Sequence, residues 1–439
     1  MKKIITAAVS FVILSCLFFG GLKVFRYLVT DDTDSYTRIM MNQLYEPEEN
    51  IDVLFVGSSH VYRSLVPEIA DGIFGKFTFN AGTSSQFMDG SYAVIQAALK
   101  NNDISHVFLE MYYGVATGEE YKDRKQLTST YIISDYIRNP LDRAAYLLNA
   151  SSKEHFSNSF IVARRNWEAL LDFGEISEIT EEKDSDAYKN YEYIKKEGSA
   201  EYYVDRGFVA NDGAIDKNKL LFSEAYGEID LSLISEDYLN SLKDIAELCE
   251  KNDVELTLFI APMPEITIAG KGNYDEYSGY INELSKSLNV EFYDFNYCKP
   301  NYFDAGCYDF FKDGDHLNTA GAERFTEVFS LFFTGQIFSD ELFYNSLSDK
   351  LADEQERIYG IAGLEKSDDD YNQGCVVSNR KEGLEYRISV CPDEGEEYVL
   401  QDFSESRIFE LPADTSGTVR IESRTAGNNS PFQIFETKY

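Results

Sequence analysis

The stretch that decides the fold is "DVLFVGSSH", Asp52 to His60. A run of apolar residues ends at Gly57, two serines and a histidine follow, and a helical pattern begins at Pro67. Short apolar runs that are closed by a glycine are typical of buried strands. The stretch therefore predicts a strand followed by a hydroxyl-bearing turn, which is either a plain polar turn or the site of a nucleophile.

Four later apolar runs, bounded by Gly, Pro or Asn, predict further buried strands. They are "FTFNAG" (77–82), "HVFLEMYY" (106–113), "ELTLFIAPMP" (255–264) and "EFYDF" (291–295). Helical patterns lie between the apolar runs, at residues 67–74, 91–100 and 235–253. The repeated order of strand, helix and strand predicts an α/β fold with a parallel sheet and helices on both faces.

Two regions interrupt this order. Residues 114–233 have no recognisable sheet strands and are rich in Tyr, Asp, Glu and Lys. We interpret them as a mostly helical insertion over the end of the sheet where ligand crevices of α/β proteins lie. Residues 345–439 contain short alternating segments separated by Gly, Pro and Asp, which predict a small β-rich domain of the sandwich type. The α/β domain itself is expected to occupy residues 50–335.

The N-terminal segment predicts a membrane anchor. Residues 4–22 carry no charge, and nineteen helical residues span about 28 Å. Lys2 and Lys3 precede the run, as they do when the N-terminus is cytoplasmic. Without a small-residue cleavage pattern, we favour an uncleaved signal anchor over residues 1–30 and a connector over 31–49. "ILSC", which ends at Cys16, leaves a lipoprotein cleavage box as the alternative.

The rest of the chain contains no second apolar span, which predicts a single-pass protein of the cell membrane with its bulk outside the cytoplasm. The formal net charge of -36 argues against nucleic acid, because phosphate binding needs clustered Lys and Arg. It also disfavours docking on anionic head groups. No CxxC, HExxH or glycine-rich phosphate loop occurs, so neither a metal site nor a cofactor is predicted.

The cysteines leave two interpretations open. Cys298 with Cys307, and Cys375 with Cys391, are close enough in sequence to be bridged outside the cell. Alternatively, each of them is a small buried residue. Cys249 lies inside a helical pattern, where a free buried thiol is expected.

His316 is the strongest candidate for a catalytic base among the four histidines. It stands in "KDGDHLN", three residues after Asp313. A carboxylate at this spacing can fold back to accept the Nδ1 proton, which leaves Nε2 free as a general base. The alternative is an acidic first turn of the following helix. His60 is expected to lack an acidic partner, and Asp315, directly before the histidine, to be the poorer orienting acid.

The serine turn and the histidine segment should lie on the same edge of a parallel sheet. Together they resemble the SGNH, or GDSL-type, hydrolase superfamily, serine esterases and acyltransferases on a flavodoxin-like three-layer fold. The first block of that family is Gly-Asp-Ser, so Ser59 takes the nucleophile's position and Ser58 stands where the aspartate would be. Gly82 matches the second block, and Asp313 and His316 match the last one.

The third block departs from the family pattern. The family has Gly-x-Asn after the third strand, whereas this chain has "LEMYYG" (109–114). The resemblance then implies an oxyanion hole made by the backbone N–H groups of Ser59 and Gly82, with Asn80 or Tyr112 as helpers. Losing one such donor typically lowers the rate about 10²- to 10³-fold.

The "GSS" spelling resembles a membrane-anchored branch of the superfamily, with relatives in D-alanylation of teichoic acids and O-acetylation of alginate-like polymers. It implies an acylated envelope polysaccharide or a small ester as substrate and a membrane-bound O-acyltransferase as partner. Ser59 would attack the ester carbonyl, His316 would take and return the proton, and Asp313 would orient His316. The alternative is a non-catalytic envelope assembly or scaffold protein, because two family residues are replaced.

Overall fold

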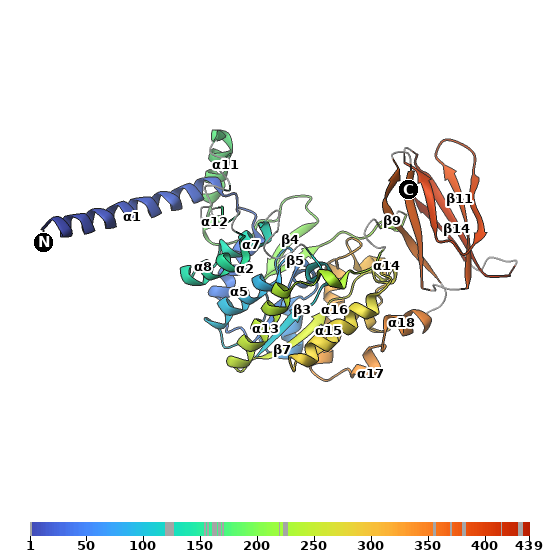
Figure 1. Ribbon diagram of the computed structural model, residues 1–439, viewed down its shortest axis with the longest axis horizontal. Helices are drawn as coiled ribbons and strands as arrows, with labels where there is room; N and C mark the ends of the chain where they lie inside the picture. The colour runs from blue at the N-terminus through green and yellow to red at the C-terminus, as the bar shows by residue number, and fades with distance from the viewer. Residues whose placement is uncertain are drawn as a thin grey trace.

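The computed structural model of the chain has a long N-terminal helix, a central α/β body and a C-terminal pair of β-sheets (Figure 1). Helix α1 (Lys2–Val29) projects from one end of the body, and the C-terminal sheets lie at the other end. The residues that the structure describes are 2–118, 127–152, 155, 158–159, 165, 168, 171–218, 220–222, 227–353, 357–368, 371–379, 383–413, 415–428 and 433–439.

A five-stranded parallel sheet, in the order β2-β1-β3-β7-β8, forms the centre of the body. Its strands are β1 (Val53–Val56), β2 (Thr78–Asn80), β3 (His106–Glu110), β7 (Glu255–Ile260) and β8 (Glu291–Asp294). Each strand lies inside one of the five apolar runs, which confirms the predicted parallel α/β sheet. The first strand in the chain lies between the second and third, and this is the strand order of flavodoxin-like folds.

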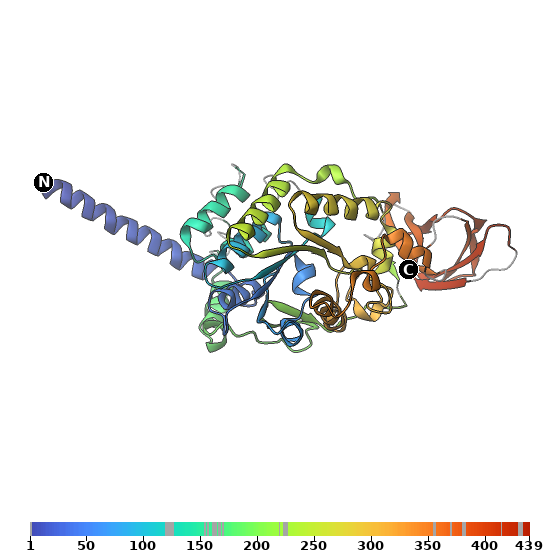
Figure 2. The same cartoon turned by 90° about the horizontal axis from the view of Figure 1, so that it is seen from below.

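Helices cover both faces of this sheet (Figure 2). On one face, α16 (Thr319–Phe333) lies beside α4 (Pro67–Phe74). The ring of Phe329 in α16 lies 5.9 Å from that of Phe55 and 5.0 Å from that of Phe108, so aromatic packing fixes α16 on the sheet. The other helices of the body include α5 (Met88–Leu99), α13 (Glu236–Lys251) and α15 (Tyr274–Ser287), and α5 packs against α13.

The insertion between β3 and β7 is helical in its first part. Its helices are α6 (Tyr113–Ala116), α7 (Thr128–Ser134), α8 (Pro140–Ala150), α11 (Phe173–Lys183) and α12 (Asp186–Lys189). The expectation that it has no strands is wrong, because β4 (Glu201–Asp205) and β5 (Phe208–Asn211) form an antiparallel hairpin. Arg206 and Gly207 at its turn have φ of 44° and 82°, and two positive φ values are what a tight hairpin turn needs.

The C-terminal region consists of two four-stranded sheets, β13-β10-β9-β6 and β12-β11-β14-β15. The strands of this region are β9 (Ile358–Asp368), β10 (Tyr371–Ser378), β11 (Leu384–Pro392), β12 (Tyr398–Ser404), β13 (Ile408–Pro412), β14 (Gly417–Thr425) and β15 (Gln433–Lys438). Side chains from both sheets share one apolar core, as the predicted β-rich region requires. One strand was unexpected: β6 (Leu221–Phe222) comes from the insertion and pairs in parallel with β9.

A buried ion cluster joins this region to the body. Glu265 begins α14 (Glu265–Gly270), is 1% exposed, and lies 3.0 Å from the buried Lys350 Nζ of α18 (Leu347–Asp353). Arg357, just before β9, donates a hydrogen bond to the other oxygen of the same carboxylate. Since a buried charge needs partners to be tolerated, the three side chains hold the start of the C-terminal sheets against the body.

Helix α1 is the one candidate membrane span among the described residues. The most apolar stretch of 18 residues within Ile5–Val29 has a mean hydropathy of 2.2, and none of it is buried by the rest of the chain, which bears out the predicted apolar N-terminal helix. The insertion contacts the last turns of α1. Lys183 of α11 donates to the Tyr27 carbonyl at 2.9 Å, and Arg26 donates to the Asp135 carbonyl.

All six cysteines are unpaired. The suggested Cys298–Cys307 and Cys375–Cys391 bridges are therefore not formed. Cys298 and Cys375 are buried, and burial raises the pKa of Cys298 to about 12 and that of Cys375 to about 11. These two thiols behave as small core side chains, and Cys249 is buried in α13 as expected.

We expect Glu265→Ala to lower the free energy of unfolding by about 3–5 kcal/mol, because it leaves the buried Lys350 without its carboxylate. Urea unfolding followed by circular dichroism measures the effect. The matched control is Glu247→Ala, which removes an exposed pair with Lys243 and should change stability by less than about 1 kcal/mol. Equal effects of the two substitutions would contradict a structural role for the cluster.

Candidate active site

Ser59 stands at the point where β1 gives way to the short helix α3 (Ser59–Tyr62). Ser58 is the N-cap of α3, and its Oγ accepts the His60 N–H at 3.3 Å. Gly57 precedes the turn, and a Cβ there would lie 2.6 Å from Glu110 Cβ and from Val61 Cγ2. The turn can approach β3 this closely only because residue 57 has no side chain.

His316 reaches Ser59 from the loop before α16. Its Nε2 lies 2.8 Å from Ser59 Oγ, and its Nδ1 lies 3.1 Å from Asp313 Oδ1. Asp313 Oδ1 also accepts the backbone N–H groups of Asp315 at 2.9 Å and His316 at 2.8 Å, so the carboxylate folds its own loop into a turn. The structure thus brings together Ser59, His316 and Asp313 in the order serine, imidazole, carboxylate.

The protonation states of Asp313 and His316 suit the transfer of a proton from Ser59. Burial alone would raise the pKa of Asp313, but its hydrogen bond with His316 and the nearby Lys312 hold that pKa well below its usual value. The pKa of His316 is lowered, because burial penalises the charged ring and His60 adds positive charge, against the opposing effect of Asp313. His316 is therefore neutral at neutral pH, and its Nε2 can accept the Ser59 proton.

His60 differs from the sequence-based expectation. Its ring is 3% exposed and lies between the rings of Tyr112 and His316, at centroid distances of 3.9 Å and 4.7 Å. Its Nε2 is 3.4 Å from Asp315 Oδ2, so His60 does have an acidic partner. Tyr112 donates to the same carboxylate oxygen at 3.1 Å. Asp315 therefore pairs with His60 and accepts a hydrogen bond from Tyr112, and Asp313 is the carboxylate that faces His316 Nδ1.

Burial alone would lower the pKa of His60, but the Asp315 carboxylate raises it above its usual value. The same side chains form a cluster in which His60, Asp315 and His316 offer ligand atoms within 4.8 Å of one another. The two rings are stacked with their planes 29° apart, and both nitrogens of His316 already face protein groups, Nε2 facing Ser59 Oγ and Nδ1 facing Asp313 Oδ1. This geometry suits a stacked support for His316 better than a metal site, which needs ligands directed at one point.

The expected oxyanion donors need correction. Asn80 Nδ2 donates to the carbonyls of Val61 at 2.8 Å and Leu65 at 2.9 Å, and Asn80 Oδ1 accepts the Gly82 N–H at 3.1 Å. Asn80 thus uses its donors to hold the segment after Ser59, and the Gly82 N–H is bound to the Asn80 side chain. Among the described residues no acceptor faces the Ser59 N–H, which leaves it as the one predicted donor open to a substrate oxygen.

Gly82 has a steric role as well. A Cβ at this position would lie 2.9 Å from both the Ser58 carbonyl oxygen and the Tyr62 nitrogen. Neither atom can move without disturbing α3, since the Tyr62 N–H is bonded to the Ser58 carbonyl. A glycine at position 82 is therefore required for the close approach of the segment after β2 to the serine turn.

Glu110 is a site residue that sequence reasoning missed. It ends β3, is 5% exposed, and its Oε2 accepts both the N–H and the Oγ–H of Ser58 at 2.8 Å. Burial raises its pKa against the opposing effects of His60 and Ser58. The signal in the sequence was an acid closing an apolar strand, "HVFLE". Glu110 thus binds the serine turn through both hydrogens of Ser58.

His106 and His155 lie outside this site. His106 stacks on Phe108 with centroids 3.9 Å apart, and its Nε2 lies 2.9 Å from Thr257 Oγ1. Burial lowers its pKa to about 4, as expected for a neutral core histidine. His155 lines a cavity next to the end of α1.

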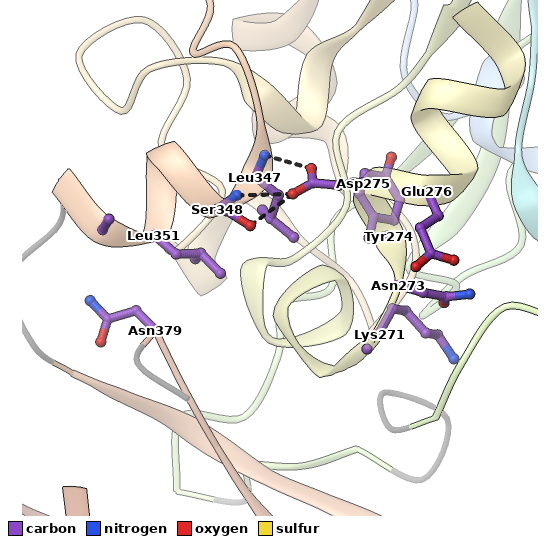
Figure 3. A pocket seen from close by; sticks show the side chains of 11 residues that line it. Lys271, Asn273, Tyr274, Asp275, Glu276, Leu347, Ser348, Leu351 and Asn379 are labelled. Atoms are coloured by element: carbon purple, nitrogen blue, oxygen red, sulfur yellow. Dashed lines mark hydrogen bonds between the residues drawn. The ribbon is translucent and has the colours of Figure 1, made fainter. Parts of the chain in front are cut away.

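A cavity of about 620 Å³ lies between α15 and α18 (Figure 3). Asp275 stands at its wall and accepts the backbone N–H groups of Leu347 at 2.8 Å and Ser348 at 3.2 Å. Its carboxylate thus caps the start of α18. None of the candidate catalytic residues lines this cavity.

No protein-family model and no curated protein matches the sequence. A structure described provisionally as a platelet activating factor from Streptococcus pneumonia is 12% identical, covers 71% of this chain and 96% of its own, and gives a TM-score of 0.33. A Cellulomonas fimi endo-beta-1,4-mannanase double mutant is 11% identical, covers 93% of this chain and 98% of its own, and gives a TM-score of 0.19. At these TM-scores neither likeness supports an argument, and the functional conclusion rests on the geometry of the site.

Proposed function

We propose that this chain is a serine ester hydrolase or O-acyltransferase of the SGNH type, with Ser59 as nucleophile, His316 as base and Asp313 as orienting acid. The observation that carries the proposal is the pair of contacts from His316, 2.8 Å from Nε2 to Ser59 Oγ and 3.1 Å from Nδ1 to Asp313 Oδ1. Residues far apart in sequence form this arrangement, and it is the one that activates a serine.

In the proposed reaction Ser59 Oγ bonds to the ester carbonyl carbon while its proton passes to His316 Nε2. The Ser59 N–H donates to the carbonyl oxygen as it becomes negative. Collapse of the tetrahedral intermediate breaks the bond between the carbonyl carbon and the leaving alkoxide, and the alkoxide takes the proton from His316. Water or a sugar hydroxyl then attacks the acyl-serine, gives its proton to His316, and releases Ser59 when that proton returns to Oγ. Asp313 remains ionised throughout.

We assign the reaction to the outer side of a membrane and to acyl esters of envelope polysaccharide. The first part is supported by α1, which is long and apolar enough to span a bilayer. The second part rests on the resemblance of Gly57-Ser58-Ser59 to the membrane-anchored branch of the superfamily. The same resemblance suggests a membrane-bound O-acyltransferase as partner, which would deliver the acyl group for transfer.

A non-catalytic scaffold is the second candidate, and one observation favours it. The N–H groups of Asn80 and Gly82 are bound to other groups of the fold. Of the oxyanion donors predicted from the sequence, the Ser59 N–H would then be the one that binds the substrate oxygen. Losing an oxyanion donor typically lowers the rate about 10²- to 10³-fold. A scaffold would keep the fold and bind an envelope polymer or membrane enzyme without turning over esters.

The first prediction separates these two functions. The detergent-solubilised full chain should hydrolyse p-nitrophenyl acetate and bind a fluorophosphonate probe covalently at Ser59. Ser59→Ala and His316→Ala should abolish both signals, whereas Ser58→Ala should retain measurable activity because its backbone N–H still binds Glu110. Wild-type protein that neither hydrolyses the ester nor takes up the probe would establish the scaffold in place of the enzyme.

The pH dependence of kcat/KM forms a second prediction. His316 must be neutral to act as a base, so activity should fall as pH drops through its pKa, with a midpoint below the ordinary histidine value because that pKa is lowered. His60→Phe keeps a ring in the stack but removes the charge that helps to lower the pKa of His316. The midpoint of this variant should therefore move to higher pH, and an unchanged or lower midpoint would contradict the assigned coupling.

Glu110 provides a third prediction. Glu110→Ala removes the acceptor of both Ser58 hydrogens, so Ser59 should lose its fixed position and the esterase rate should fall about 10²-fold. Glu110→Gln, which keeps one amide oxygen as acceptor, should recover part of the rate with unchanged KM. Glu255→Ala, which changes a mostly exposed acid at the start of neighbouring β7, should leave the rate unaffected. A positioning role is refuted if Glu110→Ala turns over like the wild type.

A further inference from the structure

Helix α8 of the insertion has apolar residues on two opposite faces. Tyr146, Leu147 and Ala150 are buried against the body. Leu141, Ala145 and Leu148 lie on the outer face at helical spacing, and Leu141 is 78% and Leu148 58% exposed. One exposed leucine is ordinary, but a spaced apolar row on the outside of a helix marks a contact surface.

A second exposed apolar pair lies at the start of α11. Leu171 is 72% exposed, and Phe173, the first residue of the helix, is 83% exposed. Together with Leu141 and Leu148 these residues form what we call the outer apolar set. Both helices lie at the end of the body from which α1 projects (Figures 1 and 2).

Contacts at the last turns of α1 hold both helices, α11 directly and α8 through Asp135. Asp135 links α8 to α1, because its carboxylate accepts a hydrogen bond from Arg143 of α8 at 3.0 Å and its carbonyl accepts one from Arg26. On α11, the buried Lys183 lies 3.1 Å from Asp32 and donates to the Tyr27 carbonyl. The outer apolar set is thus held at a constant position relative to the membrane-exit end of α1.

We propose that the outer apolar set dips into the surface of the same bilayer that α1 crosses. The candidate span ends at Val29, so a bilayer around α1 would have its boundary close to Arg26 and Tyr27, where α8 and α11 are attached. Apolar side chains at this level enter the boundary between head groups and acyl chains. Apolar side chains make this contact with the bilayer. It needs no electrostatic attraction to anionic head groups, which a chain with a net charge of -36 does not have.

This surface would give the body a second point of attachment. A single helix leaves a body free to tilt and rotate on the membrane, whereas a second contact restricts it to one orientation. The serine site would then keep a fixed height above the lipid. The proposal does not depend on the chemistry at Ser59, since it concerns only α1, α8 and α11.

Single tryptophans test the contact in the full chain. Trp167, the only tryptophan of the sequence, lies outside the described residues and is replaced in a Trp167→Phe background. Leu141→Trp, Leu148→Trp and Phe173→Trp are then introduced one at a time and reconstituted in phosphatidylcholine vesicles. Phe18→Trp in α1 is the positive control, and Ile434→Trp in β15, which replaces a half-exposed residue, is the negative control.

The three test positions should be quenched by lipids brominated near the head group more strongly than by lipids brominated near the chain ends. Phe18→Trp should be quenched by lipids of the second kind, and Ile434→Trp by neither. Unquenched test positions beside a quenched Phe18→Trp overturn the proposal. A blue-shifted but unquenched emission would also overturn it, because the surface would then be covered by protein, and an unquenched Phe18→Trp would show that α1 is not in the bilayer. No ester is turned over in this experiment, so its outcome is independent of the proposed function.

Discussion

Glu110 accepts both hydrogens of Ser58, and the geometry of the serine turn depends on this pair of 2.8 Å hydrogen bonds. They join the ends of β3 and β1, which are adjacent in the sheet. From the other side, Asn80 at the end of β2 binds the carbonyls of Val61 and Leu65. Three neighbouring parallel strands therefore each contribute one element to the site: the turn, an amide and a carboxylate. Ser59, the proposed nucleophile, is therefore positioned by the carboxyl edge of the sheet itself.

The histidine loop is held by quite different parts of the chain. Thr267 of α14 donates to the Gly314 carbonyl, and a Cβ at Gly314 would lie 2.9 Å from the ring of Phe222 in β6. Helix α14 starts at Glu265, which is bound to Lys350 and Arg357, and β6 belongs to a C-terminal sheet. The body carries Ser59, whereas the loop that carries His316 is packed between the insertion and elements tied to the C-terminal region.

The features that could be predicted from the sequence are those that depend on residues close together in the chain. Apolar runs located all five sheet strands, and the spacing of Asp313 and His316 indicated their contact because three residues of chain determine it. The hairpin at Arg206 was missed because its short strands lie in a charged segment. His60 shows the harder case, because its partner Asp315 is distant in sequence and only the folded chain places the two side chains 3.4 Å apart. The partners of Asn80 likewise follow from packing between elements.

The parallel pairing of β6 with β9 also constrains how the protein can fold during synthesis. Leu221 pairs with Ile361, so the first C-terminal sheet is completed by a strand that leaves the ribosome long before its neighbour. Pairing across such a separation is slow, because a long loop must close before the contact forms. Strand β6 therefore stays unpaired until the C-terminal strands have been synthesised. Although these strands look like an appended module, their first sheet is complete only when a segment of the insertion joins it.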